Sequence, residues 1–389
     1  MIPIILFLVV CGVLSWGYAY FFAFGVISIG TPVVEQRKIT FNSLLHPEFW
    51  ILALFGLSYV LFDRLSIDNL INYFALPLLA YIVGWSSVDG KKDNSGRTKN
   101  AVLAIALGFC LYAALNYFAN LGHKRYQLID FWSGQFRAAT GSGFLNTMIL
   151  SIILYSLLLE KRKWVQAILI IGTVISGLYM FMLGTRTQMY ICIIVFVLTL
   201  LMYNYEKNRQ LWLLRSLGVL AAIAAILLLL YSLNFLGVRD TVDYSNLIAR
   251  FQEGTGIHHS NSERTKQFLE GIYSIVAHPF GGQRKTFYYH NMWLDIGRIS
   301  GIVPLVFALI YSIRTFLNML KIFRDKSNDM GLRYLLVSVY TGVILNFFVE
   351  PVLEGLLNFF LAFCMINGIV DCYYYRKYCL DSEPEKIQT

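Results

Sequence analysis

Residues 216–238 read SLGVLAAIAAILLLLYSLNFLGV, a run of 23 residues without a charged side chain. An α-helix rises about 1.5 Å per residue, so this run can cross the roughly 30 Å hydrocarbon layer of a bilayer. Comparable uncharged runs recur along the chain: Met1–Val34, Phe49–Phe62, Asn69–Val88, Asn100–Gly122, Ala138–Leu159, Trp164–Thr185, Thr187–Tyr205, Ile299–Ile313, Tyr334–Val349 and Gly355–Val370. We therefore expect about eleven membrane helices, or twelve if the first run forms two short helices instead of one tilted helix.

The composition indicates the same class of protein. Of the 389 residues, 57% are hydrophobic and only 14% are charged, whereas about a quarter of the residues in an ordinary soluble domain are charged. Only helices and closed barrels satisfy every backbone polar group inside lipid, and runs of this length are typical of helices. The sequence has no readable repeat and no soluble segment of domain size, so we predict a single all-α polytopic membrane domain over residues 1–389.

The basic residues between the runs indicate the orientation in the membrane. Most lysines and arginines fall in six junctions near the ends of runs: Arg37–Lys38, Lys91–Lys99, Lys161–Lys163, Lys207–Arg215, Arg314–Arg333 and Arg376–Lys377. Short loops rich in Lys and Arg stay in the cytoplasm, so these junctions are predicted inside and the loops between them outside. The net charge of +9 follows from this topology, and nothing in it indicates nucleic-acid binding.

The polar loop over residues 237–289 is the largest external segment that this topology predicts. It holds three of the six histidines and is followed by His290-Asn291. Such a loop cannot lie in hydrocarbon, because each unpaired backbone polar group there costs several kcal/mol. A membrane protein that gathers its titratable groups in one surface loop is more typical of surface chemistry than of a channel.

Nine arginines fall on the side where the positive-inside rule disfavours positive charge: Arg64, Arg125, Arg137, Arg186, Arg239, Arg250, Arg264, Arg284 and Arg298. The guanidinium group presents a planar fork of donors that binds phosphate in a bidentate manner. Arg186 lies in a tight turn, residues 184–188, between two long apolar runs. We expect these arginines to bind a phosphate or diphosphate at the level of the lipid headgroups. The alternative is that they extend to the headgroups or pair with neighbouring acids.

The segment after His290 has readable geometry. At about 100° per residue, Gly297 and Gly301 share a helical stripe with His290, which would let a neighbouring helix or a lipid chain approach closely. Asp295 and Arg298 are three residues apart on another face and are expected to pair. Imidazole suits a general base at neutral pH, although a histidine at the start of a helix can also be a cap.

Further candidates lie in the last external link and beside the histidine. Glu350 and Glu354 flank Pro351 one helical turn apart. They can bind sugar hydroxyls, serve as the base in place of His290, or cap a helix. The candidate platforms for sugar stacking are Tyr288, Tyr289 and Trp293.

Four motifs in this chain resemble the bacterial O-antigen ligase/polymerase family. They are SERTKQFLEGI at 262–272, AHPFGG at 277–282, His290-Asn291 followed by Gly301, and the turn GTRT at 184–187. The family has an arginine-bearing amphipathic stretch, a His-Pro-x-x-Gly turn, and a His-Asn pair that opens a helix with a glycine at this spacing. Ligases usually carry a second glycine three residues later, where this chain has Pro304. That difference favours a repeat-unit polymerase.

The resemblance implies a glycosyltransferase of the bacterial inner membrane, with a fold related to the GT-C class and a site that faces the periplasm. It would join oligosaccharide units carried on undecaprenyl diphosphate, and membrane lipids and a chain-length regulator protein are candidate partners. His290 would act as the base, and Arg186 and Arg264 would stabilise the departing diphosphate. The substrate-binding candidates are Arg284, Arg250, Arg239, Asn291, Glu350, Glu354 and Tyr289. No metal-ligand pattern occurs in the external loops, so we expect catalysis without a metal or a cofactor.

Two other functions stay open. An O-antigen ligase would transfer the glycan to the lipid A core, and it would differ from a polymerase only in its acceptor. A transporter or flippase would place charged residues near the bilayer midplane or would break its helices in paired halves. The ionisable residues of this chain gather instead at the predicted outer ends of the helices, which favours the polymerase.

Overall fold

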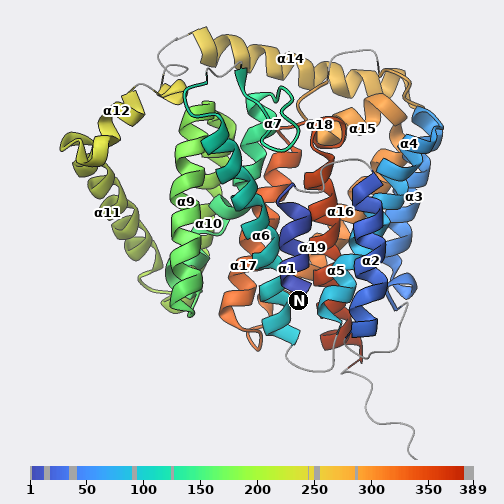
Figure 1. Cartoon of the computed structure of the whole chain (residues 1–389), viewed down its shortest axis with the longest axis horizontal. Coiled ribbons are helices and arrows are strands. Elements are labelled where there is room, and N and C mark those ends of the chain that lie inside the picture. Colours follow the sequence, from blue (N-terminus) through green and yellow to red (C-terminus); the bar gives the residue numbers. More distant parts are fainter. Residues whose placement is uncertain are drawn as a thin grey trace, which may run out of the picture. The chain divides into compact units, whose positions relative to one another are not determined.

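A computed structural model describes residues 2–12, 18–34, 42–89, 94–123, 127–243, 245–248, 255–284 and 288–380. Of these residues, 82% are helical and none forms a β-strand (Figure 1). Among the described residues, the helices long and apolar enough to cross a membrane are Ile67–Val88, Ser95–Ala119, Gly141–Leu159, Lys163–Leu183, Arg186–Lys207, Trp212–Ser232, Ile302–Arg324, Met330–Phe347 and Leu357–Cys379. The protein is therefore an all-α polytopic membrane protein, as predicted.

These nine candidate spans each overlap one of the uncharged runs in the sequence. Two further helices, α2 (Tyr18–Val34) and α3 (Pro47–Asp63), are each 17 residues long, close to the shortest of the nine. The first uncharged run forms two helices, α1 (Ile2–Val10) and α2, rather than one tilted helix. The expected total of eleven or twelve spans stays a prediction.

The chain divides into two compact units. Unit 1 comprises Met1–Tyr112 and Arg264–Thr389, and unit 2 comprises Ala113–Glu263. Two helices, α6 (Asn94–Ala119) and α14 (Thr255–Ala277), each run from one unit into the other. The predicted base His290 therefore belongs to unit 1 and the predicted diphosphate ligand Arg186 to unit 2.

Unit 1 is built around two helices that lie side by side, α5 (Leu76–Val88) and α19 (Leu357–Tyr375), which share the most extensive contact in the chain (Figure 1). The short helix α4, the π-helical turn η2 and α5 form one continuous helix. The 3-10 turn η1 (Asn42–Leu45) precedes α3 in this unit. The elements that follow α3 include α4 (Ile67–Asn69), η2 (Leu70–Ala75), α15 (Met292–Ser300), α16 (Ile302–Arg324), α17 (Met330–Phe347), α18 (Val352–Gly355) and η7 (Arg376–Leu380).

Glycines bring the backbones of α5 and α19 together. A Cβ atom added at Gly84 would meet the backbone of Met365, and one added at Gly368 would meet the backbone of Tyr81. Small residues at a helix crossing let two membrane helices approach closely and gain van der Waals contact along their length. The crossing therefore depends on the absence of a side chain at both positions.

A buried polar network connects α3, α5, α16 and α19 at the end of unit 1 where α3 begins. Glu48 is 2.9 Å from Arg314 and 2.5 Å from Nδ1 of His46. Asp371 accepts a hydrogen bond of 3.1 Å from the Tyr81 hydroxyl. Among the described residues, His46, Glu48 and Asp371 form the one cluster whose ligand atoms lie close enough to hold a metal ion, within 4.8 Å of one another. None of these three residues was a candidate from the sequence. Both carboxylates already accept bonds from protein donors.

Unit 2 contains an antiparallel pair of long helices and a third long helix that is almost wholly exposed. Its elements are α7 (Ala139–Gly143), η4 (Phe144–Asn146), α8 (Thr147–Ser151), η5 (Tyr155–Leu159), α9 (Lys163–Leu183), α10 (Arg186–Lys207), α11 (Trp212–Ser232), η6 (Phe235–Gly237) and α12 (Val238–Asp243). Ser216 is the one buried residue of α11. The exposed side of this helix is rich in leucine and isoleucine, which suits contact with lipid.

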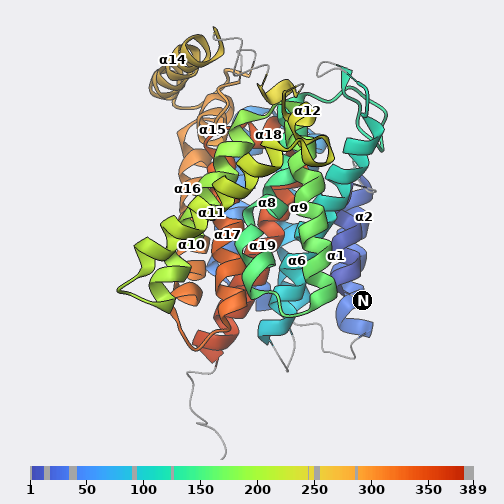
Figure 2. The same ribbon diagram turned by 90° about the vertical axis from the view of Figure 1, so that its left-hand side faces the viewer.

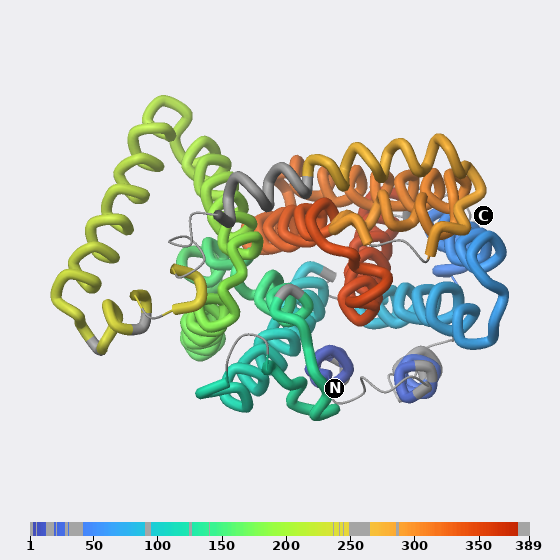
Figure 3. Tube along the Cα trace, turned by 90° about the horizontal axis from the view of Figure 1, so that it is seen from above, coloured from blue at the N-terminus to red at the C-terminus, as the bar shows by residue number. Residues whose placement is uncertain are grey.

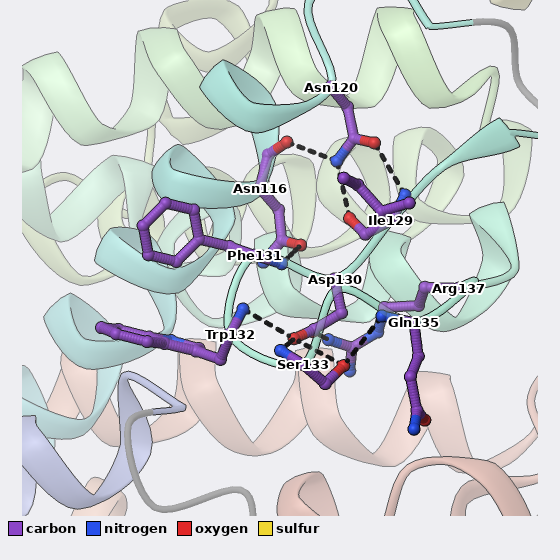
Figure 4. A network of polar contacts seen from close by, with 9 residues as sticks. All are labelled: Asn116, Asn120, Ile129, Asp130, Phe131, Trp132, Ser133, Gln135 and Arg137. Carbon is purple, nitrogen blue, oxygen red and sulfur yellow. Dashed lines mark hydrogen bonds and ion pairs between the residues drawn. The ribbon is translucent and has the colours of Figure 1, made fainter.

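The connection between α6 and α7 in unit 2 is held by bonds from side chains to the backbone (Figure 4). The Asn120 amide both donates to the carbonyl of Ile129 and accepts from its N–H, each at 2.8 Å. Asp130 accepts the N–H of Trp132 and lies 2.5 Å from Arg137. Arg137, one of the nine external arginines, therefore pairs with an acid, which was the alternative to phosphate binding.

We predict that Gly84→Ala or Gly368→Ala lowers the melting temperature of the purified protein in detergent. The added methyl group would meet the backbone of the other helix, and such overpacking costs about 1–3 kcal/mol. The control is Gly177→Ala in α9, where nothing lies within 4 Å of the added carbon and alanine is the better helix former. Melting temperatures equal to that of the wild type for both crossing variants would contradict the close approach of α5 and α19.

Candidate functional site

The turn after α14 and the junction between α15 and α16 satisfy each other's backbone groups. The N–H of Ile302 donates to the carbonyl of Pro279, and the N–H of Gly282 donates to the carbonyl of Ile299, each at 2.8 Å. A helix break leaves backbone donors and acceptors without intrahelical partners. At this break, the His-Pro-x-x-Gly turn supplies those partners.

Glycine is required on both sides of this contact. Gly281 has φ +75° and Gly301 has φ +86°, in the left-handed region that other residues rarely adopt. A Cβ atom at Gly301 would also meet the backbone of Pro279, and one at Gly281 would meet the backbone of Ile299. Gly281 and Gly301 thus allow the close approach of the turn and the helix junction.

The predicted helical stripe of His290, Gly297 and Gly301 is wrong. The helix α15 begins at Met292, after the histidine, and it ends at Ser300. Gly301 then breaks the chain direction, and α16 starts as a separate helix. The predicted stripe requires one continuous helix from His290 to Gly301. The positive φ of Gly301 excludes such a helix.

His290 occupies a strained backbone position directly before α15. Its φ is +50°, and a non-glycine residue with positive φ costs about 1–2 kcal/mol. The next residue, Asn291, is the N-cap of α15: its side chain accepts the N–H of Leu294 at 3.1 Å and donates to the carbonyl of Phe348 at 3.2 Å. Asn291 therefore fixes the histidine relative to the link between α17 and α18, and its predicted contact with substrate stays a prediction.

A buried carboxylate lies behind the imidazole of His290. Oε2 of Glu350 is 3.8 Å from Nδ1 of His290, and the two side chains are 2% and 23% exposed. The other carboxylate oxygen, Oε1, is buried and has no hydrogen-bond partner among the described residues. Tyr288 packs edge-on against the imidazole, with ring centroids 4.7 Å apart. A carboxylate that is buried without full compensation is costly, so this arrangement is typical of a functional site rather than of a packing solution.

Arg298 holds the rest of the site together. Its side chain is 1% exposed and contacts two carboxylates, Asp295 at 3.1 Å and Glu354 at 2.7 Å. It also donates to the carbonyl of Gln283 at 3.0 Å. Burial raises the pKa of Asp295 to about 6, although Arg298 and the N–H of Tyr289 oppose the rise. The pair of Asp295 with Arg298 was predicted and is confirmed. Glu354 also contacts this arginine, and its predicted contact with a sugar stays a prediction.

Two further substrate-binding candidates of unit 1 have structural contacts. The guanidinium of Arg284 lies 3.3 Å from Asp63, while its side chain remains 40% exposed. The ring of Tyr289 lies beneath the guanidinium of Arg298, 5.9 Å from its central carbon. Asp63 was not a candidate from the sequence, because it lies at the end of an apolar run some 220 residues away in the chain.

The turn before α10 forms a separate polar site in unit 2. Gly184 has φ +64° and ends α9, its N–H donating to the carbonyl of Met180 at 3.0 Å. Thr185 and Gln188 are each 2% exposed, and the Gln188 amide atoms and the Thr185 hydroxyl have no hydrogen-bond partner among the described residues. The side chain of Thr185 does not cap α10. The start of this 22-residue helix therefore holds two buried polar side chains, Thr185 and Gln188, that have no hydrogen-bond partner in the part of the chain that the structure describes.

Arg186 is the first residue of α10. The N–H groups of a first turn point out of the helix, and the helix dipole favours an anion there. A guanidinium at the same place adds a full positive charge. The predicted role of Arg186 in phosphate binding thus has a suitable local setting. The GTRT turn pointed to Arg186 in the sequence, whereas nothing in the sequence pointed to Gln188.

The structure says less about the remaining arginines that were predicted to bind substrate. The guanidinium of Arg239 donates to the carbonyls of Ser232 and Tyr231, at 2.8 and 3.4 Å, at the end of α11. Arg250 lies outside the described residues. Arg264 lies in α14, but its side chain is also outside the description.

No family model matches the chain, and no curated protein matches it. The resemblance to the O-antigen ligase/polymerase family rests on the four motifs alone.

Proposed function

We propose that the protein is a polysaccharide polymerase, a glycosyltransferase that joins oligosaccharide repeat units carried on undecaprenyl diphosphate. The proposal places His290 at the periplasmic face of the bacterial inner membrane, on a GT-C-like scaffold of eleven or twelve spans. The observation that supports it most is the half-buried imidazole of His290 with the buried carboxylate of Glu350 at its Nδ1 side. That arrangement suits the removal of a proton from a sugar hydroxyl.

The chemistry follows from the orientation of the imidazole. Nδ1 faces Glu350, which leaves Nε2 to accept the proton of the acceptor hydroxyl. The oxygen of that hydroxyl forms a bond with the anomeric carbon of the donor glycan. The bond from this carbon to the lipid diphosphate breaks, and the electron pair leaves with the diphosphate. One displacement of this kind inverts the anomeric configuration.

The carboxylate and the arginine have distinct roles in this proposal. Glu350 is a positioning residue, because it favours the imidazole orientation in which Nε2 is the acceptor and stabilises the imidazolium that forms. Arg186 and the first turn of α10 supply positive potential for the departing diphosphate.

The test of the function is reconstitution with lipid-linked repeat units extracted from a strain that lacks this protein. A polymerase yields a ladder of glycan lengths without added lipid A core, and His290→Asn abolishes the ladder. Asparagine tolerates positive φ, so the variant keeps its melting temperature while the rate falls about 10²–10⁴-fold. The control is His278→Ala, an exposed histidine of the same segment, which retains wild-type activity.

Three results would contradict this assignment. Product that forms only when core acceptor is present would identify a ligase. Movement of the lipid-linked unit across the bilayer without a new glycosidic bond would identify a transporter. A normal ladder from His290→Asn would remove His290 from the reaction.

For Glu350, we predict that Glu350→Gln lowers kcat at least about 10-fold while KM for the acceptor stays within experimental error. The amide keeps the shape of the side chain but removes the negative charge that stabilises the imidazolium. Glu350→Asp retains the charge and recovers part of the loss. A change in KM alone would mean that Glu350 binds substrate instead. An equal loss of activity in both variants with a lowered melting temperature would mean that it supports the fold.

For Arg186, we predict that Arg186→Gln lowers the rate of ladder formation by about 10²–10³-fold, as expected for loss of one group that stabilises charge in the transition state. Arg186→Lys retains the charge without the planar fork, so its rate is expected between those of the wild type and Arg186→Gln. The control is Arg215→Gln, an exposed arginine of α11 on the predicted cytoplasmic side. Equal activity of Arg186→Gln and the control would exclude the role.

A further inference from the structure

The last part of α14 carries an exposed apolar flank. Five large side chains on it are exposed, with fractions from 44% for Ile272 to 75% for Val276. The others are Phe268, Leu269 and Tyr273. At about 100° per residue, all five fall within an arc of about 140°. Side chains of this kind are seldom gathered on a surface that faces water.

The other faces of α14 have different environments. Gly271 is buried and Ile275 is half-buried, and they contact Leu294 and Gly297 of α15, respectively. Lys266 and Glu270 lie next to the apolar flank, on its side away from Gly271 and Ile275, and form an exposed pair at 3.8 Å. The helix is thus divided along its length into a face packed on protein, an apolar face and a charged face.

The helix lies at the rim of the membrane-spanning part of unit 1. Figures 1 and 2 show the part of α14 that belongs to unit 1 lying across the end of this unit where α15 lies. In the view of Figure 3, its residues after 264 run along the edge of unit 1, outside α15. The turn after it meets the start of α16 through the bond from Ile302 to Pro279 and stacks Phe280 on Phe62 of α3, with ring centroids 6.0 Å apart.

The apolar surface continues from α14 onto the candidate span below it. Phe280 is 68% exposed, and α16 carries an exposed stripe that begins at Ile302 and includes Val306, Ile310, Ile313 and Leu317. The α16 stripe faces lipid if α16 spans the bilayer, because no element of the described chain covers it. The flank of α14 extends that lipid-facing surface past the end of the span.

We propose that α14 lies in the plane of the membrane interface, with its apolar flank inserted among the acyl chains of the leaflet on the His290 side. Its charged face then lies among headgroups and water. A helix with three such faces is typical of an interfacial anchor. The consequence is that the turn carrying Gly281 stands at headgroup depth, which is where the diphosphate of a carrier lipid would lie under the proposed function.

The test uses spin labels on single cysteines in the full-length protein in phospholipid nanodiscs, with Cys379 replaced by serine because it is an exposed thiol. Ile272→Cys and Val276→Cys report the apolar flank, and Lys266→Cys and Glu270→Cys report the charged face. We expect the ratio of oxygen accessibility to nickel-chelate accessibility to be severalfold higher at the first two positions. Thermal melting of each labelled variant checks that it is folded, and no step reads glycosyl transfer.

Two outcomes would overturn the proposal. Equal and high access of the nickel chelate to both faces would place the flank in water. Protection of the apolar flank from oxygen as well as from the chelate would mean that protein, such as a second copy or a partner, covers it in place of lipid.

Discussion

The structure around His290 depends on one constraint: a break in a helix near a membrane must have its backbone groups satisfied by protein. The chain meets this constraint by pairing the turn at 278–282 with the junction at 299–302, through the bonds from Ile302 to Pro279 and from Gly282 to Ile299. In lipid, each of those groups left unpaired would cost several kcal/mol. The break can therefore exist only where the turn covers it, and α15 is held as a short buried helix at that point.

The charged groups of the site follow from the same arrangement. Because α15 is wholly buried, Arg298 on it needs acceptors, and it finds them in Asp295, Glu354 and the carbonyl of Gln283. Removing one partner of a buried ion pair is strongly destabilising, so this arginine fixes the loop and the α18 segment together. Glu350 stands just before α18, and its position behind His290 is thereby determined.

Much of the fold could be predicted from the sequence, because a charge-free run of about twenty residues has few alternatives to a membrane helix. The nine candidate spans overlap such runs, and the pair of Asp295 and Arg298 followed from their spacing. The helix break at Gly301 was missed, because a glycine in an apolar run reads equally well as a packing residue and only φ distinguishes the two. The contact of Glu354 with Arg298 could not be predicted, because the two residues lie 56 positions apart in the chain and spacing carries no information over that distance. The buried amide of Gln188 had no sequence signal beyond its closeness to Arg186.

The central claim is that His290, supported by Glu350, takes a proton from an acceptor sugar. The most direct measurement is an experimental structure of the protein with a lipid-linked repeat unit bound. We expect a sugar hydroxyl within about 3 Å of Nε2 of His290, the distance that proton transfer requires, with Glu350 on the Nδ1 side. A glycan bound at the opposite end of the helices, or an acceptor hydroxyl bonded to another group and remote from this imidazole, would contradict it.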